Sequence, residues 1–133
     1  MANHSADFLR LAGEAKQRII EVTPAEAKKL FDSGAIVLDV RDREEFEAEH
    51  LKGAAHLSRG KLEMQIHEIA PDKHSMIICY CNGGNRGALA ADTLRAMGYS
   101  RVHSIQGGLR ACASLPESSP LSIESDSLSR ART

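Results

Sequence analysis

The segment best suited to chemistry is residues 81–87, which read Cys-Asn-Gly-Gly-Asn-Arg-Gly. An apolar stretch precedes it and a helical pattern follows it, so we expect Cys81 where a strand ends and a helix begins. A helix N-terminus presents unpaired backbone N–H groups, and Gly83 and Gly84 let the chain turn so that these groups point at one centre. Such a nest favours a thiolate, and Arg86 adds positive charge. We therefore predict that Cys81 is a nucleophile.

The alternative interpretation is that Cys81 is a small buried hydrophobic residue, as most free cysteines are. That role requires neither a glycine pair nor a helix start beside it. Cys79 lies inside the apolar stretch and Cys112 near the end of the expected fold, so we predict packing roles for both. The six histidines have no zinc-site spacing relative to the cysteines, and no metal site is predicted.

Composition excludes several function classes. The 133 residues include 17 Lys and Arg against 18 Asp and Glu, which gives no basic field for nucleic acid or anionic lipid. No apolar run reaches membrane-spanning length, and the first twenty residues lack the pattern of a secretory signal. An odd number of cysteines, three, argues against a disulfide scaffold. We expect a reducing compartment, the cytoplasm.

The elements that must position Cys81 alternate between strand and helix. Crossovers too long for hairpins predict an α/β fold of three layers, with a central parallel sheet and helices on both faces. Thr23, Pro24 and Glu26 form a helix start with a capping box. Strands are expected at 20–22, 35–40, 54–57, 76–80 and 102–105, and helices at 6–19, from 24 to about 33, after Asp42, at 60–69, from 88 to about 97, and after Gly107-Gly108.

Three segments are expected along the chain. Residues 1–21 form a helical arm, in which helix 6–19 either docks on the domain or binds a partner subunit. Residues 22–115 form the α/β domain. Residues 116–133 hold six serines and two prolines, a composition typical of a disordered tail.

Within residues 22–115 the chain resembles a single-domain rhodanese of the thiosulfate sulfurtransferase type. The resemblance rests on four blocks in the expected order, which together are specific although each alone is weak. The blocks are residues 36–41, residues 45–46 with 50–57, residues 78–91, and residues 98–99 with 107–109.

The resemblance implies a sulfurtransferase. Cys81 would take a sulfane sulfur from thiosulfate or another small anionic donor and pass it to cyanide, a thiol or a protein thiol, without a metal or organic cofactor. The resulting persulfide would be held by the backbone amides of the loop. The substrate-binding residues so implied are Asn82, Gly83, Gly84, Asn85, Arg86 and Gly87.

The chain departs from the family pattern at two positions. Gly87 replaces a serine that often follows the loop arginine, which removes a hydroxyl near the persulfide and is expected to change donor preference. Cys112 lies near the place of a usual tryptophan, which leaves the core there without a large aromatic ring.

Asp39 and Arg41 end the strand at 35–40, near the expected site. We expect Asp39 to support the loop by pairing with a loop cation such as Arg86. The alternative is an ordinary strand-end pair with no direct catalytic part. Arg41 either attracts an anionic donor or forms an exposed salt bridge. The acidic stretch 43–49 is interpreted as a solvated helix face.

Two rival functions remain open. Cysteine phosphatases and arsenate reductases have five residues between Cys and Arg in a similar loop, whereas this chain has four between Cys81 and Arg86. The shorter loop suits a sulfur atom better than a phosphoryl group. The second rival is a docking or sulfur-relay module with little free turnover, which would bind a partner through helix 6–19 or the serine-rich segment. The sequence does not identify the physiological donor or acceptor.

Overall fold

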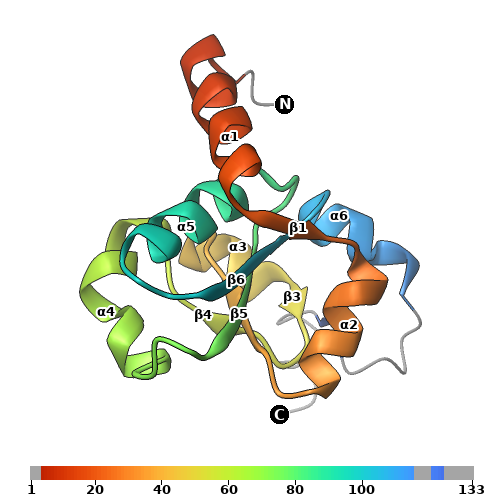
Figure 1. Cartoon of the computed structure of the whole chain (residues 1–133). Helices are drawn as coiled ribbons and strands as arrows, with labels where there is room; N and C mark the ends of the chain where they lie inside the picture. Colours follow the sequence, from red (N-terminus) through yellow and green to blue (C-terminus); the bar gives the residue numbers. More distant parts are fainter. Residues whose placement is uncertain (1–3, 116–120, 125–133) are drawn as a thin grey trace.

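A computed structural model describes residues 4–115 and 121–124 of the chain. Its centre is a five-stranded sheet in the order β1-β6-β5-β2-β4, and every neighbouring pair is parallel (Figure 1). The predicted parallel sheet is confirmed. The strands are β1 (Ile20–Val22), β2 (Ile36–Asp39), β4 (Ala55–His56), β5 (Met76–Tyr80) and β6 (Arg101–Ile105).

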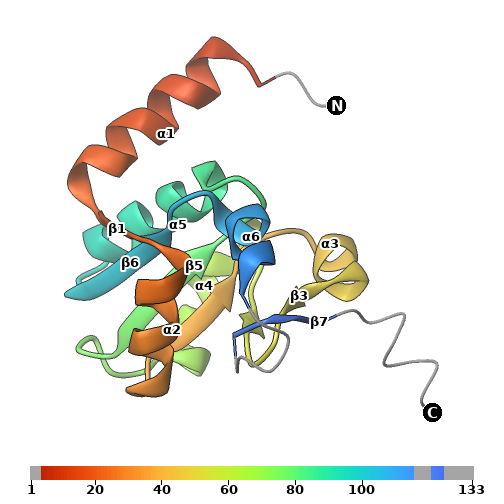
Figure 2. The ribbon, with the colours of Figure 1, turned by 90° about the vertical axis from the view of Figure 1, so that its right-hand side faces the viewer.

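Helices cover both faces of this sheet (Figures 1 and 2). Successive side chains of a strand point to opposite faces, so Ile77 and Cys79 pack toward α4 and α5, while Ile78 and Tyr80 pack toward α2 and α6. Two apolar clusters, one on each side of the sheet, result. The helices are α1 (Ala6–Arg18), α2 (Pro24–Asp32), α3 (Arg43–Ala48), α4 (Leu62–Ile69), α5 (Asn85–Ala96) and α6 (Gly108–Ala111), with short 3₁₀ turns η1 (Arg59–Lys61) and η2 (Cys112–Ser114). Among the described residues, no helix is both long and apolar enough to cross a membrane.

The local signals at the start of α2 act as predicted. The Thr23 hydroxyl accepts a hydrogen bond from the Glu26 backbone N–H at 3.2 Å, and the Glu26 carboxylate accepts one from the Thr23 N–H at 2.8 Å. Pro24 occupies the first turn, where its missing N–H costs nothing. Helix α2 follows β1 and is the first helix of the α/β domain expected at residues 22–115.

Helix α1 packs on α5 and extends beyond the rest of the domain (Figure 2). Ala12 and Ala15 are buried and allow close contact between the two helices. Arg18 forms a bidentate ion pair with Asp92 of α5, the shorter contact being 2.7 Å. The predicted helix at 6–19 is therefore confirmed, with its end at Arg18.

Part of the segment expected to be a disordered tail is placed against the domain. Strand β7 (Ile123–Glu124) pairs antiparallel with β3 (His50–Leu51), and Leu121 is completely buried. Apolar Leu121 and Ile123 give this short stretch a core-facing side that the surrounding serines obscure in the sequence. Residues 116–120 and 125–133, where disorder was also expected, lie outside the described residues.

Candidate active site

Cys81 lies directly after β5, and its sulfur faces the loop that leads into α5. The backbone N–H of Gly84 donates to the Cys81 Sγ at 3.1 Å. Gly84 is the N-cap residue of α5 and has a φ of 106°, a left-handed conformation that favours glycine. Although only 2% of Cys81 is exposed, it lines an open cleft. Cys81 thus lies between the end of a strand and the start of a helix, as the sequence predicts.

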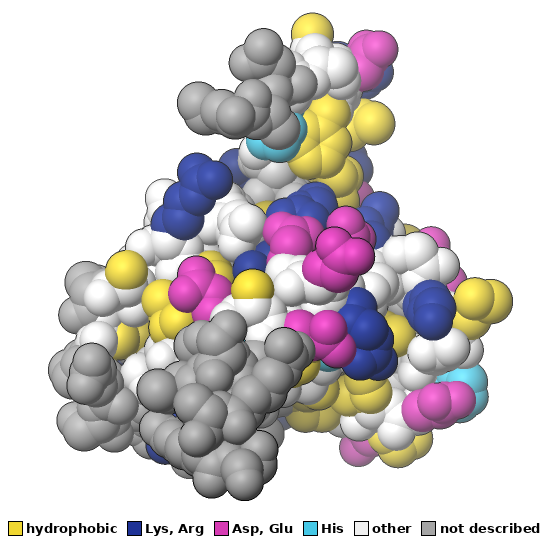
Figure 3. Space-filling view, turned by 180° about the vertical axis from the view of Figure 1, so that it is seen from behind, with side chains coloured by type: hydrophobic (Ala, Val, Ile, Leu, Met, Phe, Trp, Pro, Cys, Tyr) yellow, Lys and Arg dark blue, Asp and Glu magenta, His cyan; other side chains and the backbone are white. Residues whose placement is uncertain are grey.

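The cleft above Cys81 has a volume of about 790 Å³. Its floor is the loop, including Asn82, Gly83, Asn85 and Arg86. Three other elements supply the remaining lining: α3, α6 and the N-terminal end of α1. Figure 3 shows this helix rising above a face on which basic and acidic side chains lie next to one another.

Arg86 is paired with a carboxylate that the sequence analysis did not identify. Its two terminal nitrogens donate to the Glu45 oxygens at 2.7 and 2.9 Å. The same carboxylate accepts from the Asn82 side-chain amide at 3.1 Å. Hydrogen bonding to Arg86 is the largest effect that lowers the pKa of Glu45 below its ordinary value. Glu45 therefore connects α3 to both ends of the loop.

The interpretation of residues 43–49 as a solvated face is wrong for Glu45, which is half-buried. A weak signal was available, since Glu45 is the third residue of a helix capped by Asp42, and its carboxylate also accepts from the Asp42 N–H at 3.2 Å. Nothing in the sequence connects this glutamate with an arginine 41 positions away.

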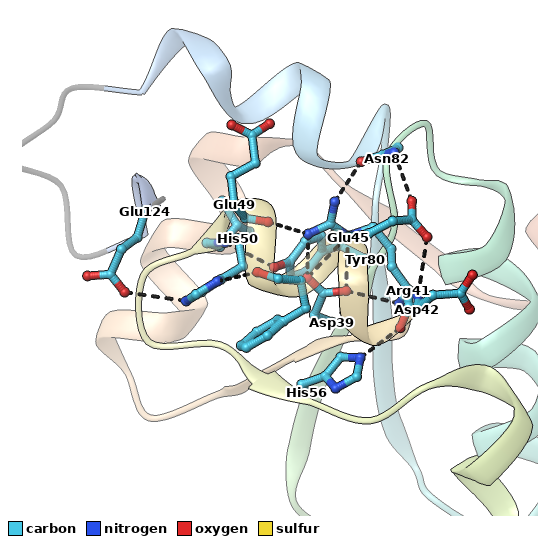
Figure 4. A network of polar contacts seen from close by, with 12 residues as sticks. Asp39, Arg41, Asp42, Glu45, Glu49, His50, His56, Tyr80, Asn82 and Glu124 are labelled. Atoms are coloured by element: carbon cyan, nitrogen blue, oxygen red, sulfur yellow. Dashed lines mark hydrogen bonds and ion pairs between the residues drawn. The ribbon is translucent and has the colours of Figure 1, made fainter. Parts of the chain in front are cut away.

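Asp39 does not pair with Arg86, and that expectation is corrected. Its carboxylate binds Arg41 instead, through a 2.8 Å contact to Nη2 and two contacts to Nε (Figure 4). Both side chains are buried, so the exposed salt bridge considered for Arg41 is also wrong. The two residues stand two positions apart, and the Arg41 side chain turns back over the strand end.

Arg41 links this buried pair to the loop. It donates to the Asn82 side-chain oxygen at 2.9 Å and to the Glu49 backbone carbonyl at 2.6 Å (Figure 4). Asp39 is thus connected to the loop through Arg41, and the Asn82 side chain contacts both Arg41 and Glu45. The donors of Arg41 are engaged within the protein, which argues against direct attraction of a substrate.

Helix α6 holds the first residues of the loop through backbone contacts. The N–H of Leu109 donates to the Cys81 carbonyl at 2.7 Å, and that of Arg110 donates to the Asn82 carbonyl at 3.2 Å. Gly108 has a φ of 60°, and a Cβ there would lie 2.6 Å from the Asn82 oxygen. Only glycine permits this approach, which explains one glycine of the Gly107-Gly108 pair.

The space beside Gly87 is filled by its neighbours. A Cβ on Gly87 would lie 3.0 Å from the Ser104 hydroxyl and 3.1 Å from the Tyr80 Cα. The Ser104 hydroxyl is buried and has no hydrogen-bond partner among the described residues. The glycine therefore accommodates close packing of α5 on β5 and β6.

The other two cysteines are core residues, as predicted. Cys79 is fully buried in the cluster beneath α4 and α5, and burial raises the pKa of its thiol to about 12. Cys112 is buried in the opposite cluster, where burial raises its pKa to about 11. Leu121 belongs to the same cluster as Cys112.

Comparison with known proteins finds similar sequences that cover most of the domain. A model of the Rhodanese-like domain matches residues 23–114. A relative named thiosulfate sulfurtransferase GlpE, from Pseudomonas syringae pv. syringae (strain B728a), is 36% identical over 87 residues, which cover 65% of this chain and 80% of the relative.

Two solved structures resemble the whole domain. A polysulfide-sulfur transferase homodimer from Wolinella succinogenes is 30% identical, with a TM-score of 0.67 over 80% of this chain and 81% of that one. A protein of unknown function from Rhodopseudomonas palustris CGA009, described as a possible tyrosine phosphatase, is 32% identical, with a TM-score of 0.72 over 84% of this chain and 92% of that one.

Proposed function

The chain belongs to the rhodanese-like family, and from this premise we propose that it is a thiosulfate sulfurtransferase that works through a persulfide on Cys81. The observation that carries the proposal is the Cys81 sulfur at the base of the cleft, 3.1 Å from the Gly84 amide nitrogen. The match to relatives named thiosulfate sulfurtransferase supports the same activity.

In the first half-reaction, the Cys81 thiolate attacks the outer, sulfane sulfur of thiosulfate. The sulfur–sulfur bond of thiosulfate breaks, sulfite leaves with the bonding electrons, and Cys81 becomes a persulfide anion. Asn82, Gly83, Gly84, Asn85, Arg86 and Gly87 form the loop around the sulfur, and backbone N–H groups there stabilise negative charge.

In the second half-reaction, an acceptor attacks the outer sulfur of the persulfide and the Cys81 thiolate leaves. Cyanide would give thiocyanate, and a small or protein thiol would give a new persulfide. Because the donor product departs before the acceptor reacts, the kinetics should be ping-pong.

The surrounding ion pairs support the loop in this scheme. Glu45 and Arg41 both bind Asn82, while Glu45 also holds Arg86. Asp39 keeps Arg41 in place from the buried side. We assign positioning roles to these residues and the nucleophilic role to Cys81 alone.

The proposal includes the cellular compartment and contacts between copies of the chain. The three cysteines are free, which suits a reducing compartment such as the cytoplasm. Helix α1 extends from the domain and exposes apolar side chains such as Leu11, and this helix is a candidate contact between copies of the chain.

Mass spectrometry after treatment with thiosulfate tests the persulfide directly. The intact protein should gain one sulfur atom, located on Cys81 by peptide mapping, and Cys81→Ser should gain none. Cys112→Ala, which removes a thiol outside the cleft, should still gain one. No gain with any sulfane donor would contradict the enzyme and support a docking module.

A phosphatase is the second candidate because one similar structure is described as a possible tyrosine phosphatase. Four residues separate Cys81 from Arg86, and Arg86 is occupied by Glu45. We therefore expect no turnover of an aryl phosphate. Turnover that is abolished by Cys81→Ser would reverse this ranking.

A further inference from the structure

The cleft is larger than the sulfur chemistry alone requires. Its volume of about 790 Å³ lies in the range of pockets that hold organic ligands. Thiosulfate is a small inorganic anion that needs only the loop at the floor. The walls formed by α1 and α6 therefore offer contacts to a larger molecule.

Charge pairing leaves one wall of the cleft cationic. Arg86 is paired with Glu45, and Arg41 is paired with Asp39 away from the cleft. Arg110 lines the cleft, is exposed, and has no side-chain hydrogen bond or ion pair with any part of the chain that the structure describes. Its guanidinium is thus available to an anionic group.

The wall on α1 is aromatic. Phe8 lines the cleft and is half-buried, and its ring lies 4.8 Å from the ring of His4, centroid to centroid. Lys16 fixes the helix near the loop by donating to the Asn85 side chain at 2.9 Å. Phe8 therefore offers an apolar surface to the carbon skeleton of a ligand.

The direction from which the acceptor attacks the persulfide indicates that the acceptor contacts the walls formed by α1 and α6. The acceptor must approach the outer sulfur from the side opposite the leaving Cys81 sulfur. Cys81 lines the cleft, so an acceptor that comes from solvent enters through it. The remainder of an organic acceptor would then lie between α1 and α6. We propose that Phe8 and Arg110 form an outer subsite for an organic thiol that carries a carboxylate, and that this thiol is the sulfur acceptor.

This inference rests on the proposed function, and its chemistry balances. The acceptor thiolate forms a bond to the outer sulfur, the bond between that sulfur and Cys81 Sγ breaks, and Cys81 keeps the electron pair. One anionic persulfide and one thiolate yield one thiolate and one new anionic persulfide. Arg110 contacts the carboxylate, not the reacting atoms.

The test compares 3-mercaptopropionate with its neutral amide as acceptors. Each enzyme is first converted to the persulfide with thiosulfate, freed of donor, and mixed with acceptor, and loss of the added sulfur is followed by quenched-flow mass spectrometry. The carboxylate preference is the ratio of the second-order rate constant for the carboxylate to that for the amide. We expect this ratio to be about three- to tenfold higher for the wild-type enzyme than for Arg110→Gln. Because the ratio is compared between variants, intrinsic differences between the two thiols cancel.

Matched controls distinguish a local contact from general charge. Arg101→Gln removes the same charge from the N-terminal end of β6, the end of the sheet opposite Cys81, and should keep the preference. Phe8→Ala should slow both organic thiols about three- to tenfold and leave cyanide unchanged. Leu9→Ala, on the adjacent exposed residue, should slow neither.

The outcomes separate the two levels of inference. An undiminished preference in Arg110→Gln, or an equal loss in Arg101→Gln, would overturn the outer subsite while the persulfide mechanism stands. Failure of the wild-type protein to form any persulfide would instead overturn the proposed function.

Discussion

The Cys81 thiol differs from the other two thiols in what surrounds it. Its sulfur accepts a backbone N–H and lines a cleft, whereas Cys79 and Cys112 are enclosed by apolar side chains. Burial raises the pKa of Cys79 to about 12 and that of Cys112 to about 11, so both remain protonated near neutral pH. Only one of the three thiols is therefore placed to react.

We expect iodoacetamide to modify the native protein once, at Cys81, at pH 8. The buried thiols should react only after denaturation, when three labels should be found. Peptide mapping by mass spectrometry checks both numbers, and Cys81→Ser should take up no label in its native state. A second label on the folded protein would contradict the assignment of Cys79 and Cys112 to the core.

The atoms around Gly87 leave little room for a side chain at this position. We expect Gly87→Ala to lower the free energy of unfolding by about 1–3 kcal/mol, because its Cβ would press on Ser104 and Tyr80. Urea denaturation measures the loss. Ser104→Ala removes the nearest atom and should restore part of the stability in the double variant. Gly13→Ala, where a Cβ meets nothing within 4 Å, is the control and should not destabilise.

At the scale of elements, Glu45 makes the position of α3 sensitive to acid. The lowered pKa means that the ionised Glu45 carboxylate is more stable in the folded state than in the unfolded state. This contribution is fully present above the ordinary value of 4.5 and is lost as the pH falls through the lowered pKa. The loop should therefore lose support from α3 only in acid.

We expect Glu45→Gln to be less stable than the wild-type protein at pH 7, with a difference that narrows below about pH 4.5. Urea denaturation at a series of pH values measures this difference. Glu47→Gln is the matched control, since Glu47 lies on the same helix in a more exposed ion pair with Arg43. A gap for Glu45→Gln that stays constant down to pH 3 would show that the carboxylate charge does not support the loop.

Local patterns predicted the elements well because their causes are local. The capping residues of α2, the apolar run of β5 and the glycines before α5 each act over a few positions. The partner of Arg86 could not be predicted in this way. That partner, Glu45, depends on how α3 approaches the loop, and many carboxylates in the sequence are equally plausible for this arginine.

At the scale of the whole molecule, the segment near the C-terminus completes the core. Leu121 is fully buried in the same cluster as Cys112, and β7 pairs with β3. The serine-rich composition concealed this role because, among the described residues of this segment, only two apolar side chains, Leu121 and Ile123, carry it. The position of α1 beside the cleft could not be predicted from the sequence either. An amphipathic pattern predicts a helix but does not identify the surface on which that helix packs.

We expect Leu121→Ala to lower the free energy of unfolding by about 2–5 kcal/mol through loss of buried apolar contact. Thermal and urea denaturation measure the change. Met64→Ala, at an exposed position on α4, is the control for a large side chain outside the core and should have little effect. A Leu121→Ala protein as stable as the wild type would show that the domain does not need this segment.

In α6, the backbone and the Arg110 side chain lie against different parts of the site. Its backbone binds the carbonyls of Cys81 and Asn82, while the exposed Arg110 side chain lines the cleft. Replacing that side chain leaves the two backbone hydrogen bonds in place. Under the proposed outer subsite, a single substitution at Arg110 would change the choice of acceptor while the loop around Cys81 keeps these contacts.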